Sequence, residues 1–451
     1  MSVNGSIMEL VAKGKLTEDV IDITNKKSVF DYEITKTNKY VKGDTIFYAE
    51  GKPNWTNTVR YYIEKKGDLL YGLYLKVTLP KLSINNLNTP EIQDETNSSS
   101  KYRVKYTDYI GNVIIDKVSL YFNGQLIDEH YGDYMQHYTD LYLSDWNRKA
   151  MLGMDDCINK PNLKIDSESI YIPLKFWFCN DIKKPLPIIA MQNTEIYIDV
   201  KFRNFNQCIN VIKLDDKNNY FSSHYTHREV PIADAVLQAN FYYLDLEERK
   251  EMATKEWSIL ITQAQVRSKE FTSNTSLEID FNHVVKDMFF LTRSSKTKEK
   301  GEFFNYSAKM KYPPSEFINA VNFDYELWRL EPKKHLLLRA RMLFNSIERI
   351  EWRDAKYFYH MQNHENYQNS LLSYVYVYSF NLDPTRNTSN NGCDFSRLDN
   401  AQLQVEVKPN SFYLGGNNYY PTDDTYELRC YATNFNILVI KGGLAGVKFS
   451  N

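Results

Sequence analysis

Residues 120–138 read LYFNGQLIDEHYGDYMQHY, and residues 342–361 read MLFNSIERIEWRDAKYFYHM. In both stretches an apolar strand ends in Phe-Asn, and a turn then leads into an acidic and aromatic segment. Asn123-Gly124 favours a tight hairpin, because the two central positions of such a turn take positive φ angles. The first stretch therefore predicts a β-hairpin, and the second predicts a related unit in the other half of the chain.

Three further pairs of segments recur in the same order around these stretches. GDLLYGLYLKV (67–77) precedes the first stretch, and VKDMFFLTRS (285–294) precedes the second. YIPLKFWF (171–178) follows the first, and YVYVYSFNL (374–382) follows the second. The fourth pair consists of two strands of alternating apolar and polar residues. Ordered pairs at a spacing of roughly 210 to 220 residues predict two similar β domains in tandem, each large enough for an eight-stranded sandwich.

The alternating strands carry the clearest strand signal. In residues 196–203 Ile, Ile, Val and Phe alternate with Tyr, Asp, Lys and Arg, so one set of side chains faces a core and the other faces water. Leu403, Val405 and Val407 repeat this pattern in the second half. Longer apolar runs bounded by Gly, Pro or Asn predict more fully buried strands: 69–79, 374–380 and 435–440.

Helix signals are sparse, and loops are long. Asp245 followed by Glu248 resembles a capping box and predicts a short helix over LEERKEMATKE. Polar stretches predict surface loops at 83–107, 155–169, 204–229, 294–314 and 383–392. Because 204–229 lies near mid-chain, we expect an inter-domain linker there. The expected organisation is an N-terminal arm (1–28), a first sandwich (29–215), a linker (216–235) and a second sandwich (236–451).

Composition restricts the class of protein. Hydrophobic residues make up 43% and charged residues 25% of the 451 residues, as in soluble globular proteins. With 55 Lys+Arg against 57 Asp+Glu, the formal net charge of -2 gives no global field that attracts nucleic acid. An aromatic content of 14% favours β structure. The five cysteines form no CxxC pair or cluster, which predicts reduced thiols. We expect the polypeptide itself to be soluble and cytosolic.

Motifs for catalysis are missing. None of GxGxxG, GxxxxGK[ST], GxSxG and HExxH occurs, so we predict no catalytic, cofactor-binding or metal-binding residue and no small-molecule substrate. His360 and His364 have the spacing of helical metal ligands, but their Asn-rich and aromatic surroundings favour ordinary surface residues. The charged run RSSKTKEKGEFF, which begins at Arg293, predicts a solvated loop. Sequons in predicted loops identify three candidate glycosylation sites: Asn97, Asn305 and Asn387.

Six stretches in order carry a resemblance to a known family. They are ELVA (9–12), KGDLL (66–70), YIPLKFWF with LPIIA (171–190), YLD with ER (243–249), YVYSF with CDFSRLDNA (376–401), and YATNFN with GGLAG (431–446). With these stretches the chain resembles the double jelly-roll major capsid proteins of nucleocytoplasmic large DNA viruses, which include iridoviruses, phycodnaviruses and mimivirus-like viruses. The most specific motif is CxFSRxDNA, from Cys393 to Ala401.

This resemblance implies an all-β chain of two tandem eight-stranded jelly rolls, with short helices in the loops. It implies a non-enzymatic role in trimeric, pseudo-hexagonal capsomers that form the icosahedral shell of a large double-stranded DNA virus. The implied partners are other copies of the chain, neighbouring capsomers, penton and minor capsid proteins, and an internal membrane layer through the N-terminal arm, without direct nucleic-acid contact. The implied location is the virion, after synthesis and assembly in the host cytoplasm.

One segment departs from the family, and two alternative functions share the fold. Residues 30–40 read FDYEITKTNKY, without the arginine usual in this region, so the contacts of the arm beneath the shell can differ. A jelly-roll carbohydrate-binding protein or glycoside hydrolase is one alternative, because fold alone does not fix function. A transient scaffold protein of the poxvirus type is the other.

Overall fold

The computed structural model describes residues 40–89, 100–142, 152–154, 159–181, 183–319, 324–330, 332–367, 374–385, 392–408, 413–414, 417–418 and 425–449. The chain from Tyr40 onward forms one compact unit. The predicted N-terminal arm (1–28) lies outside the described residues.

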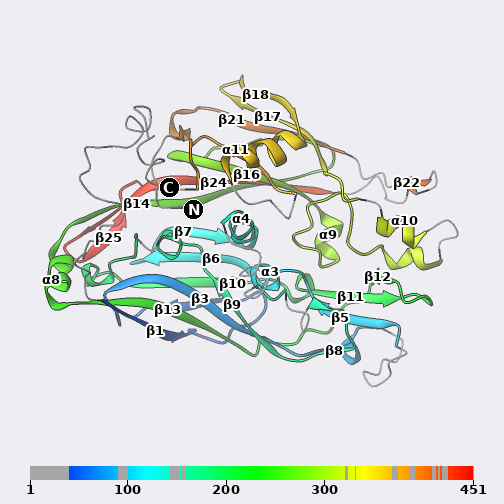
Figure 1. Ribbon diagram of the computed structural model, residues 1–451, viewed down its shortest axis with the longest axis horizontal. Coiled ribbons are helices and arrows are strands. Elements are labelled where there is room, and N and C mark those ends of the chain that lie inside the picture. Colours follow the sequence, from blue (N-terminus) through cyan, green and yellow to red (C-terminus); the bar gives the residue numbers. More distant parts are fainter. Residues whose placement is uncertain are drawn as a thin grey trace, which may run out of the picture. The chain divides into compact units, whose positions relative to one another are not determined.

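The first half contains a two-sheet β-sandwich, which we call the first roll (Figure 1). One sheet has the order β1 (Tyr40–Tyr48), β13 (Asp234–Leu244), β3 (Leu69–Leu79), β9 (Glu168–Pro173). The other has the order β2 (Thr58–Tyr62), β10 (Ile196–Phe202), β6 (Ile115–Phe122), β7 (Gln125–Tyr131). All neighbouring strands are antiparallel, and in chain order they pass between the sheets as in a jelly roll.

The second half repeats this arrangement as the second roll. One sheet has the order β14 (Trp257–Phe271), β24 (Tyr426–Lys441), β16 (Val284–Ser294), β19 (Tyr376–Ser379). The other has the order β15 (Asn274–Glu278), β21 (Ala401–Val407), β17 (Leu337–Phe344), β18 (Ile347–Asp354). Each strand occupies the place of its counterpart in the first roll, so the two-roll fold and the tandem repeat predicted from four pairs of segments are both confirmed.

The Phe-Asn hairpins are equivalent in the two rolls. Asn123 and Gly124 have φ angles of 48° and 81°, and Asn345 and Ser346 have φ angles of 50° and 67°. Asn tolerates this left-handed conformation better than most residues. Asn123 Oδ1 accepts a hydrogen bond from the backbone N–H of Glu195 at 2.6 Å, and Asn345 Oδ1 accepts one from Asn400 at 3.0 Å. Each Asn therefore ties its hairpin to the residue before the adjacent strand.

The predicted inter-domain linker is wrong, because this region belongs to the first roll. Residues 204–229 contain β11 (Ile209–Leu214) and β12 (Tyr220–Ser222), which form a three-stranded sheet with β5 (Tyr102–Tyr106). β13 pairs along its length with both β1 and β3, although most of it falls in the expected second sandwich (236–451). The first roll therefore extends to Leu244, and the predicted helix follows directly as α8 (Leu246–Thr254).

Short elements occupy the remaining connections. Within the first roll these are β4 (Leu82–Ser83), η1 (Ile84–Asn86), α3 (Ile110–Val113), α4 (Gly132–Tyr142), β8 (Lys164–Ile165), α7 (Trp177–Asn180), η2 (Ile188–Ala190) and η3 (Phe205–Gln207). Within the second they are α9 (Ser295–Glu299), η4 (Ser315–Asn319), α10 (Tyr325–Leu330), η5 (Tyr357–Met361), α11 (Gln362–Asn366), β20 (Cys393–Asp394), η6 (Phe395–Arg397), β22 (Tyr413–Leu414), β23 (Asn417–Asn418) and β25 (Leu444–Val447).

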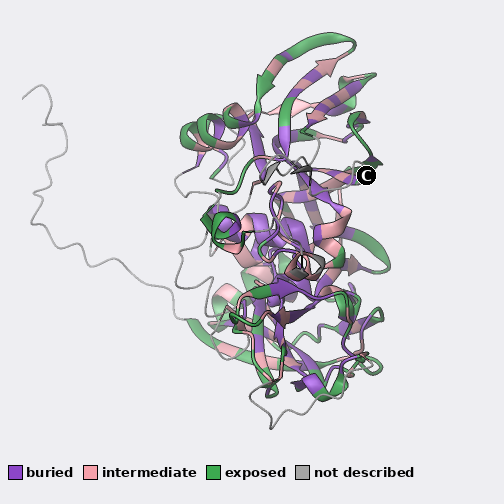
Figure 2. Cartoon of the chain, turned by 90° about the vertical axis from the view of Figure 1, so that its right-hand side faces the viewer, coloured by how far each residue is buried: buried purple, intermediate pink, exposed green. Residues whose placement is uncertain are grey.

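Burial is concentrated inside each roll and in a layer between them (Figure 2). Each roll has its own hydrophobic core between its two sheets. A third cluster joins α4 of the first roll to the outer face of β16, β19 and β24 in the second: Tyr134, Leu141, Phe289, Leu291, Tyr306, Tyr367, Val375, Val377 and Tyr431. We call this third layer the seam.

Candidate functional site

The seam is built on the helix that follows the Phe-Asn hairpin. In α4 nearly every described side chain is buried, because the helix has the first roll on one side and the second roll on the other. Met135 packs into the first-roll core, whereas Tyr134 and Leu141 belong to the seam. The buried side chains of α4 include polar and charged groups, Asp133, Gln136, His137, Thr139 and Asp140, which need partners within the fold.

A buried carboxylate at the start of α4 holds the second roll. Asp133 Oδ1 lies 3.1 Å from Nη1 of Arg293 in β16, and its Oδ2 lies 2.6 Å from Nη1 of Arg429 in β24. The hydroxyl of Tyr306 donates a 2.7 Å hydrogen bond to Asp133 Oδ1. Arg293 Nη2 also lies 2.6 Å from Glu427 Oε2. Both Asp133 and Arg293 have side chains exposed by no more than 1%.

Electrostatics fix the charges of this cluster. Burial alone favours the neutral acid, but the guanidinium groups of Arg293 and Arg429 hold the pKa of Asp133 well below its usual range. Buried ions cost several kcal/mol each to desolvate, so such a group is tolerated only with well-placed partners. Arg293 was expected in a solvated loop, and the structure instead places it in the seam. The network therefore fixes the position of one roll on the other.

Backbone contacts extend the seam toward the other end of the rolls. The N–H of Ala264 in β14 donates a 3.0 Å hydrogen bond to Asp128 Oδ1 in β7. Thr194 Oγ1 donates to the Gly443 carbonyl at 3.0 Å and accepts from the Ala445 N–H at 2.9 Å. The two rolls are thus joined by polar contacts as well as by apolar packing.

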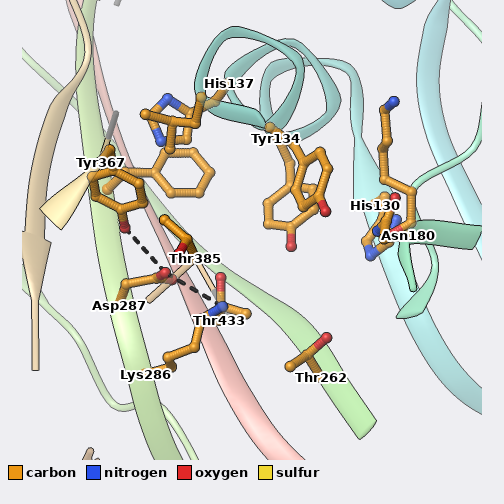
Figure 3. A pocket seen from close by; sticks show the side chains of 14 residues that line it. His130, Tyr134, His137, Asn180, Thr262, Lys286, Asp287, Tyr367, Thr385 and Thr433 are labelled. Atoms are coloured by element: carbon orange, nitrogen blue, oxygen red, sulfur yellow. Dashed lines mark hydrogen bonds and ion pairs between the residues drawn. The ribbon is translucent and has the colours of Figure 1, made fainter. Parts of the chain in front are cut away.

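A cavity of about 30 Å³ lies within the seam (Figure 3). His137 stacks on Phe289 with ring centroids 3.8 Å apart, and neither of its ring nitrogens has a hydrogen-bond partner in the described chain. Burial lowers the pKa of His137 to about 3. Asp287 accepts a 3.1 Å hydrogen bond from the Tyr367 hydroxyl and lies 3.7 Å from Nζ of Lys286. Most side chains that line the cavity are buried, but Thr385 is exposed and Asn180 and Thr262 are half-buried, so the described residues enclose it only in part.

The face equivalent to the seam is open on the first roll. The outer surface of β1, β13 and β3 carries tyrosines and lysines, and Tyr40 is 56% exposed and Tyr48 76% exposed. Tyr71 stacks on Tyr242 at 4.0 Å, and Nζ of Lys42 lies 6.0 Å from both rings. Exposed aromatic groups of this kind are common in protein interfaces.

The candidate glycosylation sites are not brought together. Asn97 and Asn387 lie outside the described residues. Asn305 is half-buried, and its Nδ2 donates to Glu302 Oε2 at 2.7 Å and to the Lys309 carbonyl at 2.8 Å. Its side-chain nitrogen is therefore occupied in the folded chain, and modification there stays a prediction.

The histidines and cysteines singled out in the sequence do not form a metal site or a disulfide among the described residues. His360 and His364 are exposed, and no group of three or more metal-ligating side chains occurs among the described residues. Cys179, Cys208, Cys393 and Cys430 are free thiols, and Cys157 lies outside the described part. No described helix is long and apolar enough to cross a membrane.

Comparisons with known proteins match the whole of this architecture. The family described as "Major capsid protein N-terminus" matches residues 28–245, and the family "Large eukaryotic DNA virus major capsid protein" matches residues 248–446. The chain belongs to the major capsid proteins of large DNA viruses. The two matched ranges meet at the beginning of α8, where the first roll ends.

Relatives of this capsid protein span its full length. The major capsid protein of Phaeocystis pouchetii virus is 24% identical, with 99% of this chain and 100% of the relative aligned. That of Paramecium bursaria Chlorella virus 1 is also 24% identical, with the same coverage. The solved PBCV-1 VP54 structure superposes with a TM-score of 0.74 at 20% identity, over 94% of this chain and 100% of the other. The Faustovirus major capsid protein gives 0.66 at 11% identity, covering 97% of each chain.

Membership in this family establishes a structural role. The protein is a component of the virion, and copies of it form the capsid shell of a large DNA virus. The carbohydrate-binding and poxvirus-type scaffold alternatives receive no support from these comparisons.

Sequence reasoning missed the seam itself. Asp133 lies inside the stretch that predicted the repeat, and Arg293 follows an apolar strand. The available signal was Asp133, an acidic residue at the start of a segment rich in large aromatic side chains. Such a segment favours burial, and a buried carboxylate needs a buried cation as its partner.

Proposed function

We propose that three copies of this capsid protein form a closed ring in which the seam is repeated between neighbouring copies. The observation that carries the proposal is the internal repeat. Within one chain, the helix after the hairpin of the first roll covers the outer face of β16 and β24 in the second roll. The described residues leave the counterpart helix and the counterpart face partly uncovered.

The counterpart of α4 is the helical segment formed by η5 and α11. It follows β18 as α4 follows β7, and Phe358 enters the second-roll core as Met135 enters the first. Unlike α4, this segment is partly exposed: Met361 is 51% exposed, and His360, His364 and Glu365 are also exposed. It therefore offers an uncovered surface in the position where α4 is covered.

The counterpart face can be aligned by a β-bulge in each roll. The bulge falls at Tyr71 in β3 and at Lys286 in β16. The seam residues Phe289, Leu291 and Arg293 lie three, five and seven residues after the bulge in β16. The residues at the same positions after the bulge in β3 are only half-buried: Tyr74, Lys76 and Thr78. These side chains and the exposed helix together supply the two halves of a second seam.

Such a contact is heterologous, so it either closes into a ring or continues as a fibre. Three two-roll chains give six similar bodies around a three-fold axis, which is a shape that tiles a shell as a pseudo-hexagonal capsomer. Interfaces of this obligate kind bury more than ~2,000 Å². The expected particle is a homotrimer of three times 53.1 kDa.

A charge placed in the proposed contact tests the ring. Met361→Glu should convert the trimer to a monomer in light scattering after size exclusion, because it buries a carboxylate without a partner. Leu327→Glu is the matched control, since Leu327 is 56% exposed on α10, another short helix of the second roll. Trimers that persist in Met361→Glu, or are lost equally in both variants, would contradict the proposed surfaces.

We further propose that the N-terminal arm (1–28) acts beneath the shell. The described chain begins with β1 at Tyr40, which pairs with Leu244 at the end of β13, close in sequence to the start of α8. A neighbouring capsomer, a penton or minor capsid protein, or the internal membrane layer is the proposed partner. Deleting residues 1–28 should leave a folded trimer and impair shell assembly, whereas unfolding on deletion would assign the arm to the core.

The remaining proposals follow from the structural role. We propose that the chain has no catalytic activity, needs no cofactor or small-molecule substrate, and does not contact nucleic acid directly. Its near-neutral charge supports the last point. Synthesis and assembly are proposed to occur in the host cytoplasm.

A further inference from the structure

A lysine in the seam has no anionic partner in the part of the chain that the structure describes. Lys175 follows β9 in the IPLKFW segment, and its side chain is only 5% exposed. Its ammonium forms no hydrogen bond or ion pair with any described residue. Its ammonium lies over the ring of Tyr138, with Nζ 5.6 Å from the ring centroid. A cation–π contact contributes about 0.5–2 kcal/mol, which is less than the several kcal/mol needed to bury an ammonium ion.

Neighbouring groups do not neutralise this charge. Burial lowers the pKa of Lys175 to about 8, so the ammonium form still predominates at neutral pH. The nearby thiol of Cys179 cannot supply an anion, because burial raises its pKa to about 12. Buried charges in proteins are normally paired, and no described residue supplies a counter-charge to Lys175.

The cavity beside Lys175 has both the charge and the size for a small anion. Of the ionic groups that line it, Lys286 lies 3.7 Å from Asp287, and His130 lies 2.9 Å from the buried carboxylate of Asp128. Lys175 is the lining lysine that has no carboxylate within ion-pair distance among the described residues. His137 adds a ring N–H without an acceptor in the described chain. A volume of about 30 Å³ holds about two water-sized groups. Both rolls contribute to the walls, from α4 and α7 on one side and β14, β16 and β24 on the other (Figure 3).

We propose that the seam cavity binds one small inorganic anion, of the size of chloride, as the counter-ion of Lys175. The site does not depend on the trimer, because a single chain supplies all of its walls. Binding there stabilises the joined arrangement of the rolls, since the cavity exists only when they are packed together.

Chloride is the probe for the first test. Thermal unfolding of the full chain at pH 7 is followed as sodium chloride replaces sodium gluconate at constant ionic strength. The melting temperature of the wild type should rise with saturation, by about 2 °C or more. Lys175→Met should abolish the dependence on chloride and should raise the melting temperature in gluconate, because it removes an uncompensated buried charge.

Lys213→Met is the matched control. Nζ of Lys213 lies 5.5 Å from the ring of Tyr102, close to the distance in the Lys175 pair, but the lysine is half-exposed on β11, outside the seam and its proposed counterpart. This variant should keep the wild-type response to chloride. An unchanged response in Lys175→Met, or a wild type that does not distinguish chloride from gluconate, would overturn the proposal.

Bromide gives a second test that needs no variant. Crystals of the wild type soaked in sodium bromide should show an anomalous peak beside Nζ of Lys175 within the seam. If Lys175→Met does not fold, this measurement decides alone, and the absence of a peak there would contradict the site.

Discussion

His137 makes the seam sensitive to acid. Its pKa falls from 6.5 to about 3 on folding, so between these values the unfolded chain binds a proton that the folded chain excludes. Stability is therefore fully present above about pH 6.5 and falls as the pH decreases, by up to about 1.4 kcal/mol per pH unit for this residue. His137→Phe keeps a stacking ring on Phe289 and should reduce the loss of unfolding free energy between pH 7 and 5.5.

An exposed histidine provides the comparison for this prediction. The ring of His224 is tilted by 42° against that of Tyr225, with centroids 4.1 Å apart, but His224 is exposed, so His224→Phe should leave the pH profile unchanged. Urea unfolding at a series of pH values measures both variants. Parallel profiles for the wild type and His137→Phe would show that His137 is not the group responsible.

Ser346 is strained by its place in the second hairpin. Ser346 has a φ angle of 67° and occupies the position of Gly124 in the first hairpin, which has a φ angle of 81°. This left-handed conformation is higher in energy for a residue with a Cβ atom than for Gly. Ser346→Gly should stabilise the chain by about 0.5–1 kcal/mol, after the greater flexibility of unfolded Gly is counted. The urea midpoint should rise with an unchanged slope, and Gly124→Ala should shift it in the opposite direction.

At the scale of elements, Asp133 joins a helix of one roll to two strands of the other. Asp133→Asn keeps the shape but removes the charge that compensates Arg293 and Arg429, and it should cost about 3 kcal/mol. Asp199→Asn is the control, because Asp199 pairs with Arg60 through two hydrogen bonds on a more exposed surface. It should cost less than about 1 kcal/mol. Similar losses of unfolding free energy in the two variants would contradict a special role for the seam.

Local patterns were enough to predict many strands but not their partners. The alternation in 401–407 and the Asn123-Gly124 turn were visible in the sequence, and both elements form as expected. β13 also alternates, with Ala235, Leu237 and Ala239 facing the core, but its partners β1 and β3 come far earlier in the chain. Nothing local specifies such distant pairing, so the domain boundary was misplaced.

The site was harder to predict than the fold for a related reason. The polarity of 204–229 suggested a linker, although it contains β11, and the charges after Arg293 suggested solvent exposure. The charge of Arg293 is compensated by Asp133 on the other roll, and that pairing exists only after the two rolls are packed. Composition alone could not separate a buried charge from a solvated one.

At the scale of the whole molecule, we propose that the seam within one chain is repeated between chains. The repeat leaves one helical surface and one sheet face uncovered in each copy, and three copies can pair all of them in a closed ring. This arrangement accounts for exposed aromatic residues of β1 such as Tyr40 and Tyr48, which are 56% and 76% exposed in the single chain.

Light scattering after size exclusion, performed on the full chain at micromolar concentration, tests this claim most directly. We expect a single species of about 160 kDa, three times the chain mass of 53.1 kDa, that is reduced to a monomer by Met361→Glu but not by Leu327→Glu. A stable wild-type monomer of about 53 kDa, which does not associate as protein or salt concentration is raised, would contradict it.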